Sequence, residues 1–187
     1  MNKIETAKAF AHEAHDRIKQ KRKYTGEPYW VHTDAVAELV STVTSDEEVI
    51  MAAHLHDVLE DVTPLYPGYS EGQIRVQFGE RVLQLVKELT DVYIKENYPK
   101  VNRKDRKRLE RERIDKVSPE AKTIKLADLI HNTESIVAYD KDFAKVYLRE
   151  KLNLLPYLAD GDPRLLQRAS MQAVAACAAV GIEIPRL

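Results

Sequence analysis

The stretch AAHLHDVLEDV, residues 52–62, places His56, Asp57, Glu60 and Asp61 close together among largely apolar residues. Its hydrophobic spacing predicts a helix on which His56 and Glu60 lie one turn apart, with Asp57 and Asp61 one turn apart beside them. Burying such groups costs free energy unless they are paired or bind a cation. The stretch therefore favours a metal site on a partly buried helix.

Histidine nitrogen and carboxylate oxygen are ligands for borderline or hard divalent ions such as manganese, iron, zinc or magnesium. One adjacent His–Asp pair is nevertheless a weak signal. Glu60 and Asp61 would look the same at the solvated end of a helix that carries a structural histidine. Other segments have to supply further ligands before a metal site becomes the better interpretation.

Two other segments supply them. Asp128 lies in IKLADLIHN, residues 124–132, among apolar residues, so its carboxylate should face the core and need a partner. His32 ends GEPYWVH, residues 26–32, where we expect a helix to begin after a loop. With His56 and Asp57, they make four ligands from three predicted helices, enough to hold one ion and leave positions for water and substrate.

Helical periodicity extends along nearly the whole chain and predicts an all-α fold. Apolar residues recur at spacings of three and four over residues 4–18, 32–43 and 81–90. Capping signals predict further helices that begin at Ser45 with Glu48, at Ser70, at Ser118 and at Asp162, and helix ends at Gly79 and Gly181. We expect a single domain over residues 1–187, with a core of about 1–140 and additional helices in 141–187 that cover this core or pair with a second subunit.

The composition is that of an ordinary globular protein. The 187 residues are 44% hydrophobic and 32% charged, with a net charge of −1 that argues against general attraction to nucleic acid or acidic membranes. The one cysteine, Cys177, lies in an apolar run where we expect a small buried side chain. Without a signal-like segment or an apolar run of membrane-spanning length, the sequence predicts a cytoplasmic protein.

Four segments in order carry a family resemblance: KRKYTGEPYWVH at residues 21–32, HLHDVLED at 54–61, QFGERVLQLVKELT at 77–90 and IKLADLIHN at 124–132. Over residues 5–140 the chain resembles the hydrolase domain of the RelA/SpoT alarmone enzymes, and in size the stand-alone small alarmone hydrolases. The resemblance implies an HD-type helical bundle. It also implies that His32, His56, Asp57 and Asp128 hold a divalent metal ion, usually Mn²⁺. No synthetase segment follows, so the resemblance implies a hydrolase without one.

The resemblance also implies roles for residues around the ion. Glu60 and Asp61 match the acidic pair that positions or activates the attacking water, and Asn132 matches an asparagine that contacts the nucleotide. Arg22 resembles the arginine that packs against the guanine base. The loop after Arg22 is one residue longer than in the long enzymes, so Lys23 competes with Arg22 for this role. His54 replaces an aliphatic residue, and we expect it to pack or hydrogen-bond away from the metal, since it lies about 200° from His56 around a helix.

The segment 100–113 holds eight lysine and arginine residues against three acids. It is either a solvated helix with internal ion pairs or a phosphate clamp, for which Arg103 and Lys107, one turn apart, are the candidates. Lys125 is a further phosphate candidate, although an exposed helix position is an equal interpretation. Nucleic-acid binding is disfavoured because aromatic residues hardly interleave with these charges.

The remaining histidines are expected to play no direct part. His12 and His15 should be exposed on the first helix, and His131 should support a ligand rather than act as one.

The sequence thus predicts hydrolysis of the 3′-pyrophosphate of ppGpp or pppGpp, giving GDP or GTP and pyrophosphate. The alternatives are an HD-type hydrolase of pppApp, of a nucleoside monophosphate or of a deoxynucleotide, and a non-catalytic nucleotide-binding module. The same chemistry would also serve an antitoxin against an alarmone synthetase.

Overall fold

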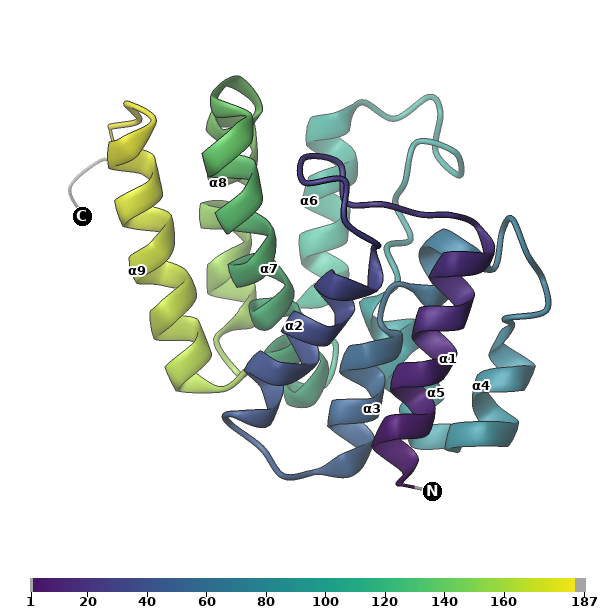
Figure 1. Cartoon of the computed structure of the whole chain (residues 1–187). Helices are drawn as coiled ribbons and strands as arrows, with labels where there is room; N and C mark the ends of the chain where they lie inside the picture. The colour runs from purple at the N-terminus through teal and green to yellow at the C-terminus, as the bar shows by residue number, and fades with distance from the viewer. Residues whose placement is uncertain (1, 184–187) are drawn as a thin grey trace.

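Helix α7, Pro119–Tyr139, is the longest helix of the computed structural model, which describes residues 2–183. It contacts α2, α3, α5, α8 and α9 and lies near the middle of the molecule (Figure 1). Packing on several sides explains why its sequence is apolar beyond one stripe, with Ile124, Leu126, Ala127 and Ile130 all fully buried. Asp128 therefore sits on a helix that is packed on several sides.

The structure confirms the predicted all-α fold class. Within residues 2–183 the backbone forms helices joined by loops, with one isolated bridge between Lys21 and Pro28 in place of any strand. The helices are α1 Lys3–Arg17, α2 Trp30–Ser41, α3 Glu47–Leu55, a π-helix Val58–Val62, α4 Glu71–Phe78, α5 Glu80–Leu89, α6 Arg103–Ile114, α7 Pro119–Tyr139, α8 Lys141–Leu154, a 3₁₀ turn Leu155–Leu158 and α9 Pro163–Ala179.

Helices α1, α2 and α3 form a closely packed group at the N-terminal side. The contact surfaces of α1 and α3 are lined by small residues, since Ala7, Ala11 and Ala14 of α1 and Ala52 and Ala53 of α3 are fully buried. Small side chains let the two backbones approach closely. This close approach places the C-terminal ends of α1 and α3 beside each other, where the functional residues gather (Figure 1).

Most of the predicted caps are present. Ser118 accepts a hydrogen bond from the backbone of Ala121, and Asp162 caps α9 in the same manner. Gly79 ends α4 with φ of 97°, a conformation that favours glycine. The predicted box at Ser45 was wrong, because Asp46 is the N-cap of α3 and accepts from the backbone of Glu48 at 3.0 Å.

The expectation of one continuous helix through residues 52–62 was also wrong. Helix α3 ends at Leu55, His56 and Asp57 form a turn, and a π-helix follows, in which the N–H of Thr63 donates to the carbonyl of Val58 at 3.1 Å. The helical spacing on which the sequence prediction placed Glu60 above His56 is therefore not continuous. Such π turns are frequent at functional sites.

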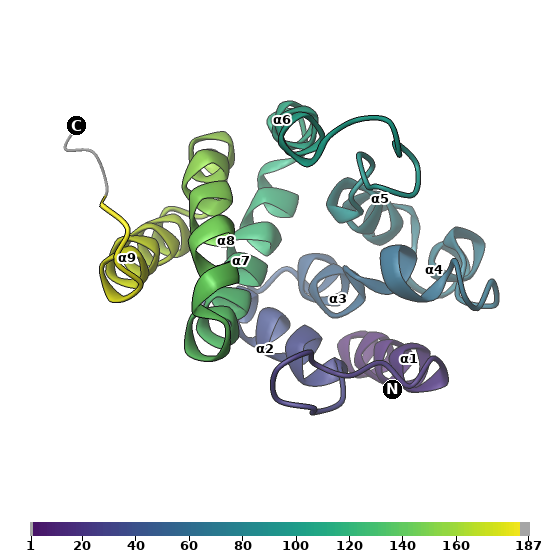
Figure 2. The same ribbon diagram turned by 90° about the horizontal axis from the view of Figure 1, so that it is seen from above.

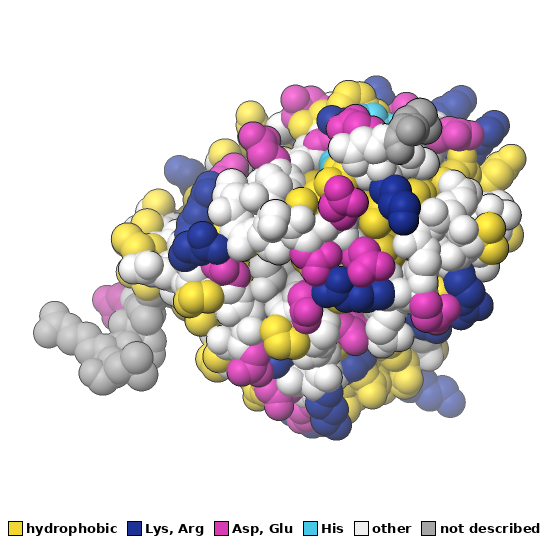
Figure 3. Space-filling view, turned by 90° about the horizontal axis from the view of Figure 1, so that it is seen from below, with side chains coloured by type: hydrophobic (Ala, Val, Ile, Leu, Met, Phe, Trp, Pro, Cys, Tyr) yellow, Lys and Arg dark blue, Asp and Glu magenta, His cyan; other side chains and the backbone are white. Residues whose placement is uncertain are grey.

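The C-terminal helices α8 and α9 cover α7 on the side away from α1 (Figure 2). A second small apolar cluster joins these three helices and includes Ile136, Ala144, Leu148 and Cys177, which is buried as expected. No helix within the described residues is long and apolar enough to span a membrane. On the face shown in Figure 3, basic side chains lie among acidic ones rather than in a patch of one sign.

Candidate metal centre

Three of the four predicted ligands converge at the meeting point of α2 and the end of α3. His32 lies in the first turn of α2, and His56 and Asp57 follow α3 directly. One ligand atom from each lies within 4.8 Å of the others, and both imidazoles are buried. Among the described residues this is the one group of three or more potential ligand side chains that comes so close together.

The imidazoles of His32 and His56 each have one ring nitrogen without a hydrogen-bond partner in the described part of the chain. His56 Nδ1 donates to the carbonyl of Ala53 at 2.8 Å, which leaves Nε2 as the nitrogen with a free lone pair. The Nε2 atoms of both His32 and His56 are buried without a hydrogen-bond partner. His56 Nε2 nevertheless lies 3.1 Å from an oxygen of Asp57. Two lone pairs and a carboxylate facing one another fit a shared divalent cation.

The electrostatics of the group point the same way. Burial disfavours a charged His56, but the Asp57 and Asp128 carboxylates more than offset this and raise its pKa to about 9. Burial likewise opposes ionisation of Asp57, yet His56 and His32 hold its pKa well below the usual range. The carboxylates thus stay charged, and they favour a positive partner on His56 Nε2, which is a proton or, in its place, a metal cation.

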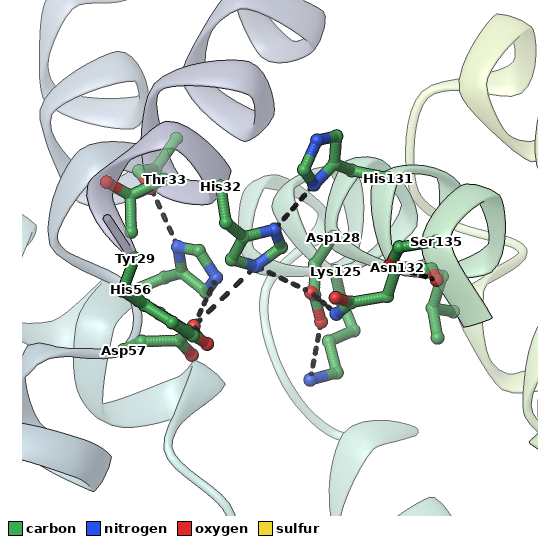
Figure 4. A network of polar contacts seen from close by, with 12 residues as sticks. Tyr29, His32, Thr33, His56, Asp57, Lys125, Asp128, His131, Asn132 and Ser135 are labelled. Carbon is green, nitrogen blue, oxygen red and sulfur yellow. Dashed lines mark hydrogen bonds and ion pairs between the residues drawn. The ribbon is translucent and has the colours of Figure 1, made fainter. Parts of the chain in front are cut away.

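Asp128 is placed beside the group rather than within it. Its Oδ1 lies 3.3 Å from His32 Nε2 and accepts a hydrogen bond from Asn132 Nδ2 at 2.6 Å, while Oδ2 pairs with Lys125 at 3.0 Å (Figure 4). Burial alone would raise the pKa of Asp128, but Lys125 and His32 hold it well below its usual value. The carboxylate is therefore ionised and close enough to contribute a fourth ligand to an ion held by His32.

His131 supports His32 from the opposite side. The two Nδ1 atoms are 2.7 Å apart, and burial together with His32 lowers the pKa of His131 to about 4 (Figure 4). A neutral His131 accepts the Nδ1–H of His32, which orients the Nε2 of His32 toward the carboxylates. This is the supporting position that the sequence predicted.

Tyr29 is a residue of this centre that sequence reasoning missed. Its hydroxyl donates to Asp57 Oδ2 at 2.6 Å and so orients a ligand carboxylate. The signal was present in the GEPYWVH segment, three residues before His32, but an aromatic residue before a helix is more often a packing residue.

Glu60 and Asp61 project from the π-helix toward different neighbours. Glu60 Oε2 accepts from the backbone N–H of Asp91 at 2.9 Å, and burial with the Asp91 and Asp57 charges raises its pKa to about 8. Asp61 Oδ2 accepts from Gln20 Nε2 at 2.8 Å, and burial with the Asp57 charge raises its pKa to about 6. Two acids beside the centre thus differ in their affinity for a proton.

A cavity of about 180 Å³ adjoins Asp128. Among the predicted substrate residues it is lined by Lys107, Lys125 and Asn132. Arg111, which was not predicted, and Lys151 also line it. Arg103 lies outside this lining and forms a two-point ion pair with Glu150 at 2.7 and 2.9 Å.

Arg22 and Lys23 take different directions. Arg22 Nη2 donates to Asn132 Oδ1 at 3.0 Å and to Ser135 Oγ at 3.1 Å, which links the loop before α2 to α7. Lys23 is exposed, lies 4.7 Å from the ring centre of Tyr24 and pairs with Asp140 at 3.5 Å. Arg22 is therefore the one of the two that joins Asn132 at the site.

The expectation that His12 and His15 are exposed was wrong. His15 is fully buried, with Nδ1 2.6 Å from Gln20 Oε1, and His12 stacks on Trp30 with ring centres 4.4 Å apart. Both follow a buried alanine of α1, and the close approach of α1 to α3 buries more than the apolar stripe alone. His54 is buried and lies 3.2 Å from Asp34, facing away from the metal centre as predicted.

The sequence and the structure are similar to those of known hydrolases with an HD domain. The HD domain family model matches residues 7–162. A guanosine-3′,5′-bis(diphosphate) 3′-pyrophosphohydrolase of Aquifex aeolicus is 33% identical over 156 residues, 83% of this chain and 21% of the relative. The corresponding hydrolase MESH1 of Xenopus tropicalis is 35% identical over 131 residues, 68% of this chain and 65% of the relative.

The chain therefore spans about a fifth of the length of the long bacterial relatives and just under two thirds of the smaller ones. A solved structure described as a metazoan ortholog of SpoT that hydrolyzes ppGpp superposes with a TM-score of 0.79 at 27% identity. The superposition covers 94% of this chain and 96% of that one.

Proposed function

Because this chain belongs to the HD domain family, we propose that it is a metal-dependent hydrolase that removes the 3′-pyrophosphate of the guanosine alarmones ppGpp and pppGpp. The products are pyrophosphate and GDP or GTP. The observation that carries the proposal is the pair of unpartnered Nε2 atoms of His32 and His56 facing Asp57, beside a cavity lined by Lys107, Lys125 and others. The similarity to named pyrophosphohydrolases supports the choice of substrate.

His32, His56, Asp57 and Asp128 would hold the ion, and mixed nitrogen and oxygen donors suit Mn²⁺. When bound, such a cation lowers the pKa of a water molecule and offsets negative charge on phosphoryl oxygens. Tyr29 and His131 keep Asp57 and His32 in the orientation that this binding needs.

Glu60 and Asp61 would orient the attacking water and manage its proton. Asp61, with a pKa of about 6, is ionised at neutral pH and is the acceptor. Glu60, with a pKa of about 8, keeps a proton at neutral pH and is fixed by the backbone N–H of Asp91. Two carboxyl groups whose surroundings separate their pKa values are a usual arrangement for acid–base work.

The nucleotide would lie across α7. Arg22, already held by Asn132 and Ser135, offers a flat guanidinium to the base. Lys107, Arg111 and Lys125 line the cavity next to Asp128 and face the phosphates. Arg103 is the weakest of these candidates, because it pairs with Glu150 and lies outside the cavity lining, whereas Lys107 lines the cavity although it pairs with Asp91 at 3.3 Å. A cytoplasmic location and assembly into oligomers stay predictions.

The test is pyrophosphate release from ppGpp with Mn²⁺, comparing the wild type with Asp61→Asn, which removes the proposed proton acceptor. We expect turnover by the wild type, its loss on chelation, and about a 100-fold or larger fall in kcat for the variant with unchanged Mn²⁺ binding. A panel with pppApp, nucleoside monophosphates and deoxynucleotides identifies the substrate. Tight ppGpp binding without turnover by folded, Mn²⁺-loaded protein would instead indicate a binding module.

A further inference from the structure

Helix α1 ends in a turn that fixes two side chains against each other. The N–H of Lys19 donates to the carbonyl of Asp16 at 2.9 Å, and the N–H of Gln20 donates to the carbonyl of His15 at 3.0 Å. This pair of bonds is the Schellman motif, which usually has glycine where Lys19 adopts φ of 53°. The backbone itself therefore holds Gln20 next to His15, at the cost of a left-handed lysine.

The two side chains are joined as well. His15 is fully buried, and its Nδ1 lies 2.6 Å from Gln20 Oε1. An amide oxygen only accepts, so His15 has to carry its proton on Nδ1. His15 Nε2 is then an acceptor, and it is buried without a hydrogen-bond partner in the described part of the chain. An unsatisfied buried nitrogen costs free energy, which indicates that this arrangement is not optimised for stability alone.

The direction of this bond decides what Gln20 can do. With Oε1 turned to His15, the amide nitrogen points the other way and donates to Asp61 Oδ2 at 2.8 Å. The reverse orientation of the amide would put an oxygen against the Asp61 carboxylate. His15 thus determines that Asp61 receives a hydrogen-bond donor, and one of its two oxygens is held.

We propose that His15 and Gln20 form a positioning unit, in which the Gln20 amide, fixed by its hydrogen bond with His15, orients the carboxylate of Asp61 toward the attacking water. This inference rests on the proposed function of Asp61. Neither residue touches the substrate, and both act through Asp61. The same turn leads directly into the loop that carries Arg22, so the contact to Asp61 and the contact to Asn132 come from one short segment of the chain.

The first test is Gln20→Met, which keeps the length of the side chain and removes both polar groups. We expect kcat to fall by about 10- to 100-fold while KM changes less than twofold, since Gln20 acts through Asp61 and does not bind the substrate itself. In an Asp61→Asn background the same substitution should have no further effect. Equal turnover by Gln20→Met and wild type would overturn the proposal, as would an equal additional loss in the Asp61→Asn background.

Two matched controls separate positioning from stability. Lys19→Gly removes the strain of a left-handed lysine and leaves the hydrogen bonds from His15 to Gln20 and from Gln20 to Asp61 in place. It should leave kcat unchanged and Tm equal or higher. Gln77→Met makes the same chemical change at an exposed position on α4 and should be silent. A kcat loss in Lys19→Gly as large as that in Gln20→Met would attribute the effect to the turn and overturn the role of the amide.

A second measurement needs no turnover and therefore stands if the proposed substrate is wrong. Nitrogen-15 NMR of the full chain should show His15 protonated at Nδ1 and not at Nε2. His15→Phe should shift the side-chain amide signal of Gln20 and leave that of Gln77 in place. The Nε2-protonated form of His15, or an unchanged Gln20 signal, would overturn the proposal, whereas inactivity of the wild type toward every nucleotide would count against the proposed function only.

Discussion

Two clusters of the same composition lie on opposite sides of the packing between α2 and α3. Each contains two histidines and one aspartate. His32 and Asp34 of α2 are two positions apart, as are His54 and His56 at the end of α3. Residues two positions apart point about 200° away from each other around a helix, so both helices contribute to both clusters. The inner cluster consists of His32, His56 and Asp57, and the outer cluster of His12, Asp34 and His54. Their comparison shows which features make the inner cluster the candidate metal site.

In the outer cluster the carboxylate is already satisfied. Both oxygens of Asp34 lie 3.0 Å from His12 Nε2, and Lys8 Nζ is 3.2 Å away. His12 stacks on Trp30, so its position follows from an aromatic contact as well. The three side chains are not among those of the described residues whose ligand atoms all lie within 4.8 Å.

In the inner cluster one ligand atom from each side chain lies within 4.8 Å of the others, and both histidines have a buried Nε2 without a hydrogen-bond partner, against one such nitrogen, His54 Nδ1, in the outer cluster. The nearest ammonium, that of Lys125, pairs with the far oxygen of Asp128 and leaves Asp57 to face the two imidazoles. Residue type is therefore equal in the two clusters, and the difference lies in whether the ligand atoms converge on one point and whether a lysine already pairs with the shared carboxylate.

The strongest test of this difference exchanges one histidine of each cluster for leucine. His56→Leu should weaken Mn²⁺ binding by at least about 100-fold and abolish pyrophosphate release, because loss of even a supporting residue costs 10- to 100-fold. His54→Leu should keep both within about twofold. Calorimetric titration with Mn²⁺ and the release assay measure the two effects.

Circular dichroism and thermal unfolding serve as the control, because both substitutions replace a buried histidine by an apolar side chain. Equal loss of Mn²⁺ binding in the two variants would mean that the clusters are not distinct in function.

Much of the fold was readable from the sequence, for reasons that the structure makes clear. Ser118 and Asp162 cap helices through local hydrogen bonds, which depend on neighbouring residues alone. The break after Leu55 was not readable, because the apolar spacing of residues 52–62 continues smoothly through it. A π turn changes side-chain direction without changing the hydrophobic pattern.

The site divides in the same way. His32, His56 and Asp57 were predicted as ligands because a buried charge needs a partner, and the structure brings them together. His15, Gln20 and Tyr29 were missed or misjudged. Their contacts join α1 and the loop before α2 to the π-helix, and only the close packing of α1 on α3 creates them. Local sequence carries little information on such long-range hydrogen bonds.

An intermediate effect is expected in the response of stability to acid. Burial lowers the pKa of His54 to about 4, against about 6.5 in the unfolded chain, so the unfolded state binds more protons between these values. Stability therefore falls as the pH drops from about 6.5 toward 4. Between pH 7 and 5 the wild type should lose about 2 kcal/mol more than His54→Leu, by linkage at one site.

Urea unfolding of both proteins at the two pH values measures this difference. Because the other buried histidines are common to both proteins, their contributions cancel in the comparison. Parallel loss of stability in the two proteins would show that His54 is not the group responsible.

The smallest effect is expected at the cation of the outer cluster. Lys8 is 38% exposed, so its ion pair with Asp34 is screened by solvent, and Lys8→Met should change the free energy of unfolding by less than about 0.5 kcal/mol. The variant should still bind one Mn²⁺ per chain, because removing the ammonium does not bring the nitrogens of His12 and His54 together. Titration with Mn²⁺ shows whether the Lys8 ammonium or the geometry of the histidines keeps a metal ion out of the outer cluster. If Lys8→Met bound a second equivalent of Mn²⁺, and the double variant Lys8→Met with Asp34→Asn did not, the lysine alone would distinguish the outer cluster from the inner one.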